Sequence, residues 1–493
     1  MRITVRARPE YFARRLFRVD KRFRTSVRPS RRILAVAEAF GIGVDEEQVF
    51  TVFQDFQLEI NPGQILLVLG ESGGGKSLLL RAVAEEMGVL EEFRPVLDAS
   101  RIRIRRDAPI IETLGDDVSD AIEKLSLAGL NDAYLFLRRF EELSDGQRYR
   151  YRIARLLDSR ARTWVLDEFT STLDRATAKA VAYCLQKSAR RRGVTVLAAT
   201  THEDIASDLN PDIVVRKGFG PSVSVEYLSP GPRPCSLLEE AVIERGGLKD
   251  YAVLKHLHYK PGRVFGVRAV YRARVGGELA GVIVYSSPIL MLSSRFRAFP
   301  FLREKFREAG GMAGWAKTVN SLFTRVARVI VHPKYRSIGL GAKLVRETLP
   351  LSPTPYVETL AVMARYNPFF EKAGMTRIDA PPPRDPFFDK LAALGFNVEA
   401  AYSWKRAAEA LASMPRSVLM RVRRLAVERL ERLRAAHVRS RSELLRRLKR
   451  GLDVEAMARV IVMRPLSTVY LAWRKPERED LPQPLSSETY DGG

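Results

Sequence analysis

The sequence has few of the residues that build disulfide frameworks, metal clusters or membrane spans. Only two cysteines, Cys184 and Cys235, and five histidines occur among its 493 residues. Two cysteines cannot staple a fold of this size, so the composition favours a reducing, cytoplasmic compartment. No apolar run reaches the roughly 20 residues that cross a bilayer, and the longest candidate, 279–292, is interrupted by serines and a proline. The arginine-rich start lacks the apolar core of a secretory signal. We therefore expect a soluble protein with no integral membrane partner.

Acidic residues are also scarce relative to basic ones. Lys and Arg number 82 against 58 Asp and Glu, a net charge of +24. The excess is local, since residues 1–34 hold 12 basic and 2 acidic side chains and residues 403–450 hold 15 and 4. One-sided basic segments predict a nucleic-acid or ribosome partner. The alternatives are an anionic membrane surface and the surface charge of a protein from a hot environment.

Two proline-rich breaks divide the chain, which is too long for one domain. The segments 229–236 (SPGPRPCS) and 380–386 (APPPRDP) support neither a helix nor a central strand. Alternating apolar runs and amphipathic stretches before the first break are typical of a parallel α/β sheet. We expect a basic arm at 1–30, an α/β domain at 31–228, a linker at 229–236, an α+β domain at 237–385, a basic helical region at 386–474 and a polar tail at 475–493.

A glycine-rich loop follows the first buried strand of the α/β domain. Residues 65–69 run into 70–77 (GESGGGKS), and a helix is predicted over 78–87. This order is that of the P-loop, whose backbone amides surround phosphate oxygens at a helix N-terminus. Lys76 is expected to reach the β- and γ-phosphates and the Ser77 hydroxyl to bind Mg²⁺. The expected nucleotide-binding residues of the loop are Gly70, Ser72, Gly73, Gly74, Gly75, Lys76 and Ser77.

Further motifs of ATP chemistry follow in chain order. A predicted strand over 163–166 ends in Asp167, placed to bind nucleotide and Mg²⁺, and Glu168, placed to polarise the attacking water. A third strand, 194–199, leads to His202, which we expect to sense the γ-phosphate, with a structural histidine as the alternative. The segment 143–147 (LSDGQ) opens a helix and can donate to a phosphate through Ser144, Gly146 and Gln147.

Together these motifs resemble the ATP-binding-cassette (ABC) ATPase family over residues 31–228, and LSDGQ is the most specific of them. The resemblance implies that LSDGQ of one domain closes over the ATP held by the P-loop of another. Because this chain has one of each, we expect a homodimer with two composite ATP sites. It departs from the transporter pattern, since no glutamine occurs between Ser77 and Gly146. We therefore expect a nucleic-acid-associated ATPase rather than a transport subunit.

A second glycine-bearing loop lies in the α+β domain. A predicted strand over 323–331 leads into 332–341 (HPKYRSIGLG) and a helix over 342–348. Backbone amides at the N-terminus of this helix could again bind an anion. An ordinary strand–helix turn is the alternative. A Gly276-Gly277 turn predicts a hairpin of 264–275 and 278–285, preceded by a helix over 237–259.

This loop and the strand at 357–363 resemble the GNAT acyltransferase fold over about 237–378. The resemblance implies that the loop after the fourth strand binds the pyrophosphate of acetyl-CoA, and that the pantetheine arm enters where this strand splays from the next. The residues it implies for the cofactor are Arg336, Ile338, Gly339, Gly341, Ala342 and Asn367. In that family a tyrosine usually protonates the departing thiolate, and its position falls at Phe370, so Tyr366 is the candidate to replace it as the acid. His258 or Glu358 is a candidate general base.

The sequence thus predicts an α/β P-loop ABC-type ATPase domain, an α+β GNAT-like acyltransferase domain and a basic helical C-terminal region. The expected cofactors are ATP, Mg²⁺ and acetyl-CoA. The leading hypothesis is ATP-dependent acyl transfer to nucleic acid, with RNA ahead of DNA, because base amines in a duplex must be exposed before they react. The alternatives are a ribosome- or translation-associated ATPase whose GNAT-like domain only docks, and protein N-acetylation. The arginine-rich helices have their own alternative, which is pairing with acidic residues of the ATPase domain.

Overall fold

The computed structural model describes residues 4–5, 16–25, 28, 30–41, 43, 48–258, 264–378, 385–432, 438–463 and 468–485. The predictions for residues 6–15 of the basic arm, for residue 259 at the end of the expected helix, for 433–437 and 464–467 of the basic helical region and for 486–493 of the polar tail lie outside this set. The described chain divides into two compact units. The first runs to Thr359 and adds Ala364–Thr376 and Leu471–Leu485, and the second holds Leu360–Met363 and Arg377–Tyr470. Within the described part, no helix combines the length and the apolar character that crossing a membrane requires.

A six-stranded sheet forms the centre of the α/β domain, in the order β5-β6-β7-β4-β8-β9. All neighbours are parallel except β8 and β9, which confirms the predicted parallel sheet. Because the strands are parallel, the carboxyl ends of β4, β6 and β7 meet at one edge. The strands are β4 (Ile65–Gly70), β5 (Val96–Asp98), β6 (Thr163–Leu166), β7 (Thr195–Thr200), β8 (Ile213–Lys217) and β9 (Val223–Tyr227).

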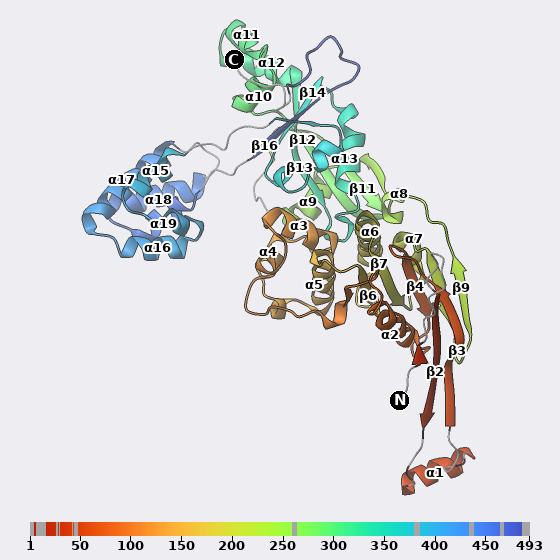
Figure 1. The fold of residues 1–493 in the computed structure, drawn as a ribbon. Helices are drawn as coiled ribbons and strands as arrows, with labels where there is room; N and C mark the ends of the chain where they lie inside the picture. The colour runs from red at the N-terminus through yellow and green to blue at the C-terminus, as the bar shows by residue number, and fades with distance from the viewer. Residues whose placement is uncertain are drawn as a thin grey trace. The chain divides into compact units, whose positions relative to one another are not determined.

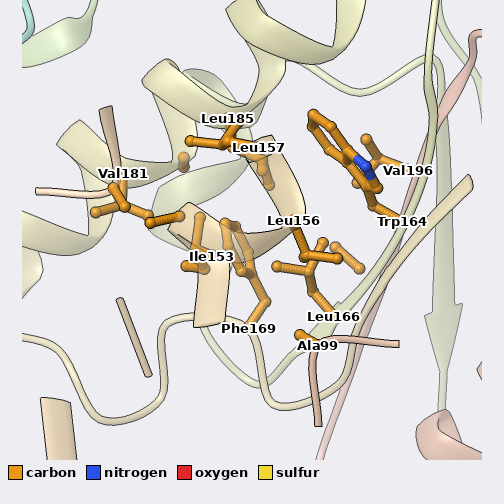
Figure 2. Packing of buried hydrophobic residues seen from close by; sticks show 14 of the residues in the cluster. Ala99, Ile153, Leu156, Leu157, Trp164, Leu166, Phe169, Val181, Leu185 and Val196 are labelled. Carbon is orange, nitrogen blue, oxygen red and sulfur yellow. The ribbon is translucent and has the colours of Figure 1, made fainter. Parts of the chain in front are cut away.

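Helices on this sheet bury a large apolar core. Figure 2 shows side chains of α5 such as Ile153 and Leu156 gathered with Trp164 of β6 and with Leu185 of α6. Trp164 is fully buried, and truncating such a side chain costs about 3–5 kcal/mol. The helices of this domain are α2 (Lys76–Met87), α3 (Val118–Leu127), α4 (Ala133–Phe136), α5 (Asp145–Asp158), α6 (Arg175–Arg192) and α7 (Ala206–Leu209).

The second half of the expected basic arm is a strand. β2 (Leu16–Thr25) lies antiparallel between β1 (Thr4–Val5) and β3 (Gln48–Glu59), and α1 (Arg31–Phe40) connects β2 to β3 (Figure 1). Alternate residues of β2 face the domain, so Phe17, Val19 and Lys21 are buried, whereas Arg18 and Arg22 are exposed. The ring of Phe17 meets Phe93 edge to face at 5.9 Å. The prediction of an arm is therefore wrong for residues 16–25, because apolar residues at every second position make a half-buried strand.

A seven-stranded sheet follows, in the order β10-β11-β12-β13-β14-β16-β15. Its strands are β10 (Val242–Arg245), β11 (Val267–Val275), β12 (Glu278–Ser286), β13 (Phe323–Val331), β14 (Tyr356–Ala361), β15 (Thr376–Ile378) and β16 (Val469–Arg474). The predicted hairpin at Gly276-Gly277 is confirmed. The predicted helix over 237–259 is wrong, because β10 pairs with β11 and Gly247 then caps a new helix.

Short helices surround this sheet. They are α8 (Ser236–Glu239), α9 (Leu248–Leu254), α10 (Ser293–Ala298), α11 (Leu302–Glu308), α12 (Met312–Leu322), α13 (Leu340–Thr348) and α14 (Phe369–Lys372). The expected linker is fixed to α7, since the amide and hydroxyl of Ser236 both donate to the Asp208 carboxylate at 2.8 Å. The expected polar tail packs back as far as Leu485, whose amide donates to the Ala298 carbonyl at 3.0 Å.

The second unit is a helical bundle around its own core. Its helices are α15 (Pro386–Ala393), α16 (Trp404–Ala412), α17 (Arg416–Arg432), α18 (Val438–Arg450) and α19 (Val454–Ile461). Some of its arginines support the fold: Arg429 is buried, pairs with Asp385 at 2.8 Å and lies over the ring of Phe387. Others, among them Arg421, Arg424 and Arg432, are exposed.

Candidate functional site

The P-loop lies at the carboxyl edge of the first sheet, between β4 and α2. Two of its glycines are required by close backbone approach. A Cβ at Gly70 (φ +151°) would lie 2.2 Å from the Lys217 carbonyl oxygen, and one at Gly75 (φ +96°) would lie 2.5 Å from Val52 Cγ1. No larger residue fits these positions without moving the backbone or its neighbours. The loop therefore holds its amides in the tight turn that phosphate binding needs.

The Lys76 ammonium is held inside this loop. Its Nζ donates to the carbonyls of Gly70 at 2.8 Å and Glu71 at 2.7 Å. Burial lowers the pKa of Lys76, while the negative charges of Asp167 and Glu168 act in the opposite direction. A cation kept at the mouth of a ring of amides is suited to the β- and γ-phosphates of ATP.

Ser77 and Asp167 form an oxygen pair suited to Mg²⁺. The Ser77 hydroxyl donates to Asp167 Oδ1 at 2.9 Å, so the start of α2 and the end of β6 supply two oxygen atoms to one point. Hydroxyl, carboxylate and phosphate oxygens are the ligands that Mg²⁺ prefers. The donor set therefore fits the ion. When bound, Mg²⁺ would neutralise charge that develops on the phosphates.

Glu168 follows Asp167 in a strained backbone conformation. Its φ is +50°, its side chain is exposed, and its amide donates to Asp167 Oδ1 at 3.1 Å. A left-handed conformation in a non-glycine residue costs energy and is concentrated at functional sites. The exposed Glu168 carboxylate is accessible to a water molecule, as its predicted role requires.

His202 lies just beyond β7, the strand between β4 and β6 in the sheet. Its amide donates to Thr200 Oγ1 at 3.2 Å, and its side chain is half-buried. The fold therefore brings His202 to the same edge as Lys76 and Asp167. Its role as a γ-phosphate sensor stays a prediction.

The LSDGQ segment begins α5 with a capping box. The Ser144 amide donates to Gln147 Oε1 at 3.0 Å, so the Gln147 side chain serves the helix end. A Cβ added at Gly146 would lie 3.4 Å from the Thr172 carbonyl oxygen, which places this turn against the segment that follows Glu168 in the same chain. Phosphate contact by Ser144, Gly146 and Gln147 stays a prediction, since it requires a second copy.

Two residues of α5 connect these motifs and were not predicted. The hydroxyl of the half-buried Tyr149 accepts a hydrogen bond from the Thr170 amide at 3.2 Å, and desolvation raises its pKa. Arg150 donates from Nε to the Gly146 carbonyl at 3.2 Å and from its terminal nitrogen to the Gly129 carbonyl at 2.8 Å. Their position on the helix that follows LSDGQ is the only sequence signal for these contacts, because Thr170 and Gly129 are distant in the sequence.

The second glycine loop joins β13 to α13. β13 pairs with β14 in parallel only over Phe323–Tyr356, Thr324–Val357 and Arg325–Glu358, although β13 continues to Val331. Gly339 (φ +100°) begins α13, and Gly341 faces the ring of Phe369. Ile338 and Ala342 are buried beside them. The loop thus follows a strand that separates from its neighbour.

This loop is attached to the ATPase part of the same unit. Arg336 donates from Nε to the Val331 carbonyl at 2.8 Å and from a terminal nitrogen to the Asn131 carbonyl at 2.5 Å. The Ser337 hydroxyl donates to the Ser126 carbonyl at 2.7 Å. Burial lowers the pKa of Arg336, with the Asp132 carboxylate opposing this effect. The guanidinium is used for this attachment, which weighs against the predicted contact with a cofactor phosphate.

The other predicted acyl-site residues lie around α14. Asn367 is exposed and Tyr366 half-buried just before this helix, while Phe370 is buried, with its ring tilted against that of Phe369 at a centroid distance of 4.1 Å. Glu358 is not suited to act as a general base. It is 1% exposed and held by Arg295, whose Nε and terminal nitrogen donate to its oxygens at 2.9 and 2.5 Å.

Comparisons with known proteins agree with the nucleotide site. The sequence profile of the family described as ABC transporter matches residues 53–171. The aliphatic sulfonates import ATP-binding protein SsuB 1 of Pseudomonas savastanoi pv. phaseolicola is 31% identical over 199 residues, which is 37% of this chain and 80% of that protein. The methionine import ATP-binding protein MetN 3 of Pectobacterium atrosepticum is 29% identical, over 34% of this chain and 57% of that protein.

A solved structure is also similar. The dimeric, post-hydrolysis state of the ATP-binding cassette MJ0796 bound to ADP and Pi aligns with 38% of this chain and 94% of that chain, with 18% identity and a TM-score of 0.31. The chain spans just over half of the methionine import protein and four-fifths of the sulfonates import protein. On the family profile, the 31% identity over most of a relative and the site geometry above, the chain belongs to the ABC family of ATPases.

Proposed function

We propose that this ABC ATPase is coupled to an acyl-CoA-dependent acyltransferase that acts on nucleic acid, with RNA ahead of DNA. The observation that carries the proposal is the separation of β13 from β14 directly before the glycine loop. β13 is the fourth strand in the order β10-β11-β12-β13, as the GNAT resemblance implies. A parallel pair that opens after three residue pairs leaves backbone groups available to an extended ligand such as pantetheine.

A basic groove beside this loop supports the choice of an acyl-CoA. Its volume is about 590 Å³, and Ile338, Gly339 and Ala342 line it. Its other lining groups include four cations, Lys187, Lys343, Arg346 and Lys372, and two carboxylates, Glu239 and Glu347. The helix end and the excess of cations suit the phosphates of coenzyme A. The first turn of α13 would hold the pyrophosphate, and the bound thioester would supply the acyl group.

Acyl transfer to an amine requires one bond change and two proton transfers. An amine nitrogen of the acceptor bonds to the thioester carbonyl carbon, and the carbon–sulfur bond breaks with its electron pair going to sulfur. The nitrogen loses one proton and the thiolate gains one. Tyr366 is the candidate donor of that proton, because Phe370 has none to give.

The ATPase part also meets the second glycine loop at α6, which packs against Pro333–Tyr335. Asp174 caps α6 by accepting from the Thr177 amide at 3.1 Å. Although burial opposes ionisation, the Thr177 hydrogen bonds and the charges of Lys334 and Arg150 keep the pKa of Asp174 below its usual value. Lys334 belongs to the second glycine loop, and Asp174 closes the segment that starts at Glu168. Movement of that segment during an ATP cycle would therefore reach the acyl-CoA loop.

A homodimer with two composite ATP sites is part of this proposal. Each chain has one P-loop and one LSDGQ segment, so a complete site in the ABC arrangement needs two copies.

The second candidate is a ribosome- or translation-associated ATPase whose GNAT-like domain is a docking module. The buried Phe370 at the expected acid position favours it. A transport role is the third, suggested by the names of the relatives. It is opposed by the lack of a glutamine between Ser77 and Gly146.

Transfer of a labelled acetyl group tests the proposal. The full chain with ATP is incubated with labelled acetyl-CoA and total RNA, DNA or protein, beside the Gly341→Val variant. Label in RNA or DNA that depends on Gly341 supports it. Label in protein only, or none despite ATP hydrolysis, overturns it, and the second result favours the docking module.

A further inference from the structure

A β-bulge brings two arginines of β13 to the same face of the second sheet. Val284 of β12 pairs with Arg328, and the next residue, Tyr285, pairs with Val326, so Ala327 has no opposite residue. Residues three apart on a regular strand point to opposite faces. With one extra residue inserted, Arg325 and Arg328 share a face. Arg325 belongs to the last residue pair that joins β13 to β14, so the two arginines lie where these strands separate.

The neighbours of this pair carry too little negative charge to balance it. Glu358 lies opposite Arg325 in the sheet. Both of its carboxylate oxygens, however, accept hydrogen bonds from Arg295, and the Arg295–Glu358 ion pair is buried. In the described part of the chain, neither Arg325 nor Arg328 has a carboxylate oxygen within 4.0 Å. The one carboxylate that faces Arg325 across the sheet is therefore already paired with Arg295.

The hydrogen bonds of the two arginines are with neutral groups. Arg325 Nε donates to the Ser286 hydroxyl at 3.2 Å, and a terminal nitrogen of Arg328 donates to the Ala327 carbonyl at 2.7 Å. Arg328 Nε is buried, with no hydrogen-bond partner among the described residues. Burial lowers the pKa of Arg325, as do the charges of Arg328 and Arg295, while Glu358 raises it. Holding two partly buried cations together without a counter-ion is unfavourable unless a ligand supplies the anion.

The face that carries these arginines is opposite the helix of the glycine loop. Val284 packs in a cluster with Leu254 of α9, so Arg325 and Arg328 lie on the same face of the sheet as α9, which packs on β11 and β12. The adjacent Tyr285 points the other way, and its hydroxyl lies 2.8 Å from Thr348 Oγ1 of α13. An acyl donor bound at the start of α13 would therefore approach the opening between β13 and β14 from one face, leaving the other to the acceptor.

We propose that Arg325 and Arg328 bind a phosphate group of the acyl acceptor, and that this acceptor is a nucleotide residue. The proposal rests on the proposed acyl transfer and names the residues that would recognise its acceptor. Planar guanidinium groups recognise phosphate oxygens through paired, charge-assisted hydrogen bonds. A lysine-rich protein acceptor would be repelled by the same two charges.

Calorimetry on the full chain, saturated with ADP and coenzyme A, tests this. Both other phosphate sites are then filled, and a mixture of the four ribonucleoside 5′-monophosphates is titrated at millimolar concentration. Wild-type protein is expected to bind the monophosphates and not the nucleosides. Arg325→Gln/Arg328→Gln should weaken monophosphate binding at least about tenfold. Arg325→Lys/Arg328→Lys, which keeps both charges, should recover part of the lost affinity. The matched control, Arg303→Gln/Arg307→Gln, removes the same charge from exposed positions of α11 and should bind as wild type.

Several results would overturn the proposal. These are unchanged binding in Arg325→Gln/Arg328→Gln, no monophosphate binding by wild-type protein that binds coenzyme A, or binding of free glutamate through the same arginines instead. Failure to bind coenzyme A at all would remove the proposed acyl transfer, which is a separate outcome. Thermal unfolding without ligand is the second measurement. Arginines that await an anion should leave the melting temperature of the Gln pair unchanged or higher, whereas a marked fall would show that they only support the fold.

Discussion

The hydroxyl of Ser77 donates a hydrogen bond to Asp167 Oδ1 across 2.9 Å, which joins the first turn of α2 to the end of β6. Two segments about ninety residues apart in the sequence thereby bring two oxygen atoms to one point.

The first prediction concerns this pair. Asp167→Asn should remove most of the gain in ATP affinity that Mg²⁺ provides, because the ion loses a charged ligand. Binding of ATP in the presence of a chelator should change little, since the P-loop amides and Lys76 are untouched. Calorimetry with and without Mg²⁺ measures both. Equal Mg²⁺ dependence in variant and wild-type protein would contradict the assignment.

Replacing Glu168 by Gln should separate ATP binding from hydrolysis. The amide cannot polarise water, so hydrolysis should fall by about 10²–10⁴-fold while nucleotide binding persists. If the composite sites exist, ATP-bound dimers should accumulate, and light scattering would detect them. Lys76→Ala is the control that loses both nucleotide and dimer. A strictly monomeric Glu168→Gln protein in saturating ATP would refute the homodimer.

Gly341→Val should prevent coenzyme A binding and leave ATP binding intact. The Gly341 backbone has no need of a positive φ, and its nearest neighbours, Phe369 and Val331, allow a Cβ at 3.6 Å or more. The variant should therefore fold, yet its branched side chain would fill space that a pyrophosphate needs. Calorimetry with each ligand decides. Unimpaired coenzyme A binding would move the cofactor away from this loop.

Glu86 on α2 should make stability depend on pH. It is 8% exposed, both carboxylate oxygens lack a hydrogen-bond partner among the described residues, and burial raises its pKa to about 7. The folded state thus keeps a proton that the unfolded chain loses near pH 4.5, so this residue lowers stability as pH rises from about 4.5 through 7. Glu86→Gln should melt higher than wild type at pH 8 and similarly at pH 4. An equal difference at both pH values would disprove this origin.

The exposed arginines of α17 should contribute electrostatic affinity without sequence preference. Changing Arg421, Arg424 and Arg432 to Gln should reduce the slope of log affinity against log salt by about 0.7–0.9 for each phosphate that the variant no longer neutralises. Arg423 is the contrast, because its Nε donates to the Leu448 carbonyl at 2.6 Å and its replacement should lower the melting temperature. A triple variant with an unchanged salt slope would remove α17 from the nucleic-acid interface.

The sequence alone predicted which residues the fold gathers at the carboxyl edge of the first sheet. The positions of Lys76, Ser77, Asp167 and Glu168 follow from short patterns, in which an apolar strand ends at a fixed place and glycines or carboxylates come next. Such patterns depend on neighbouring residues along the chain and not on which distant segments pack against them. The second glycine loop and the hairpin at Gly276-Gly277 were predicted for the same reason.

Tertiary structure decided what depends on partners far along the chain. β10 forms because β11 offers it a pairing edge, and Phe17 is buried because Phe93 lies against it. Arg336 donates to the Asn131 carbonyl, a partner about two hundred residues away that the loop sequence does not reveal. The shared face of Arg325 and Arg328 depends on a bulge at Ala327, which is set by the register with β12. No local pattern encodes that register, because the energy that fixes it comes from packing across the whole sheet.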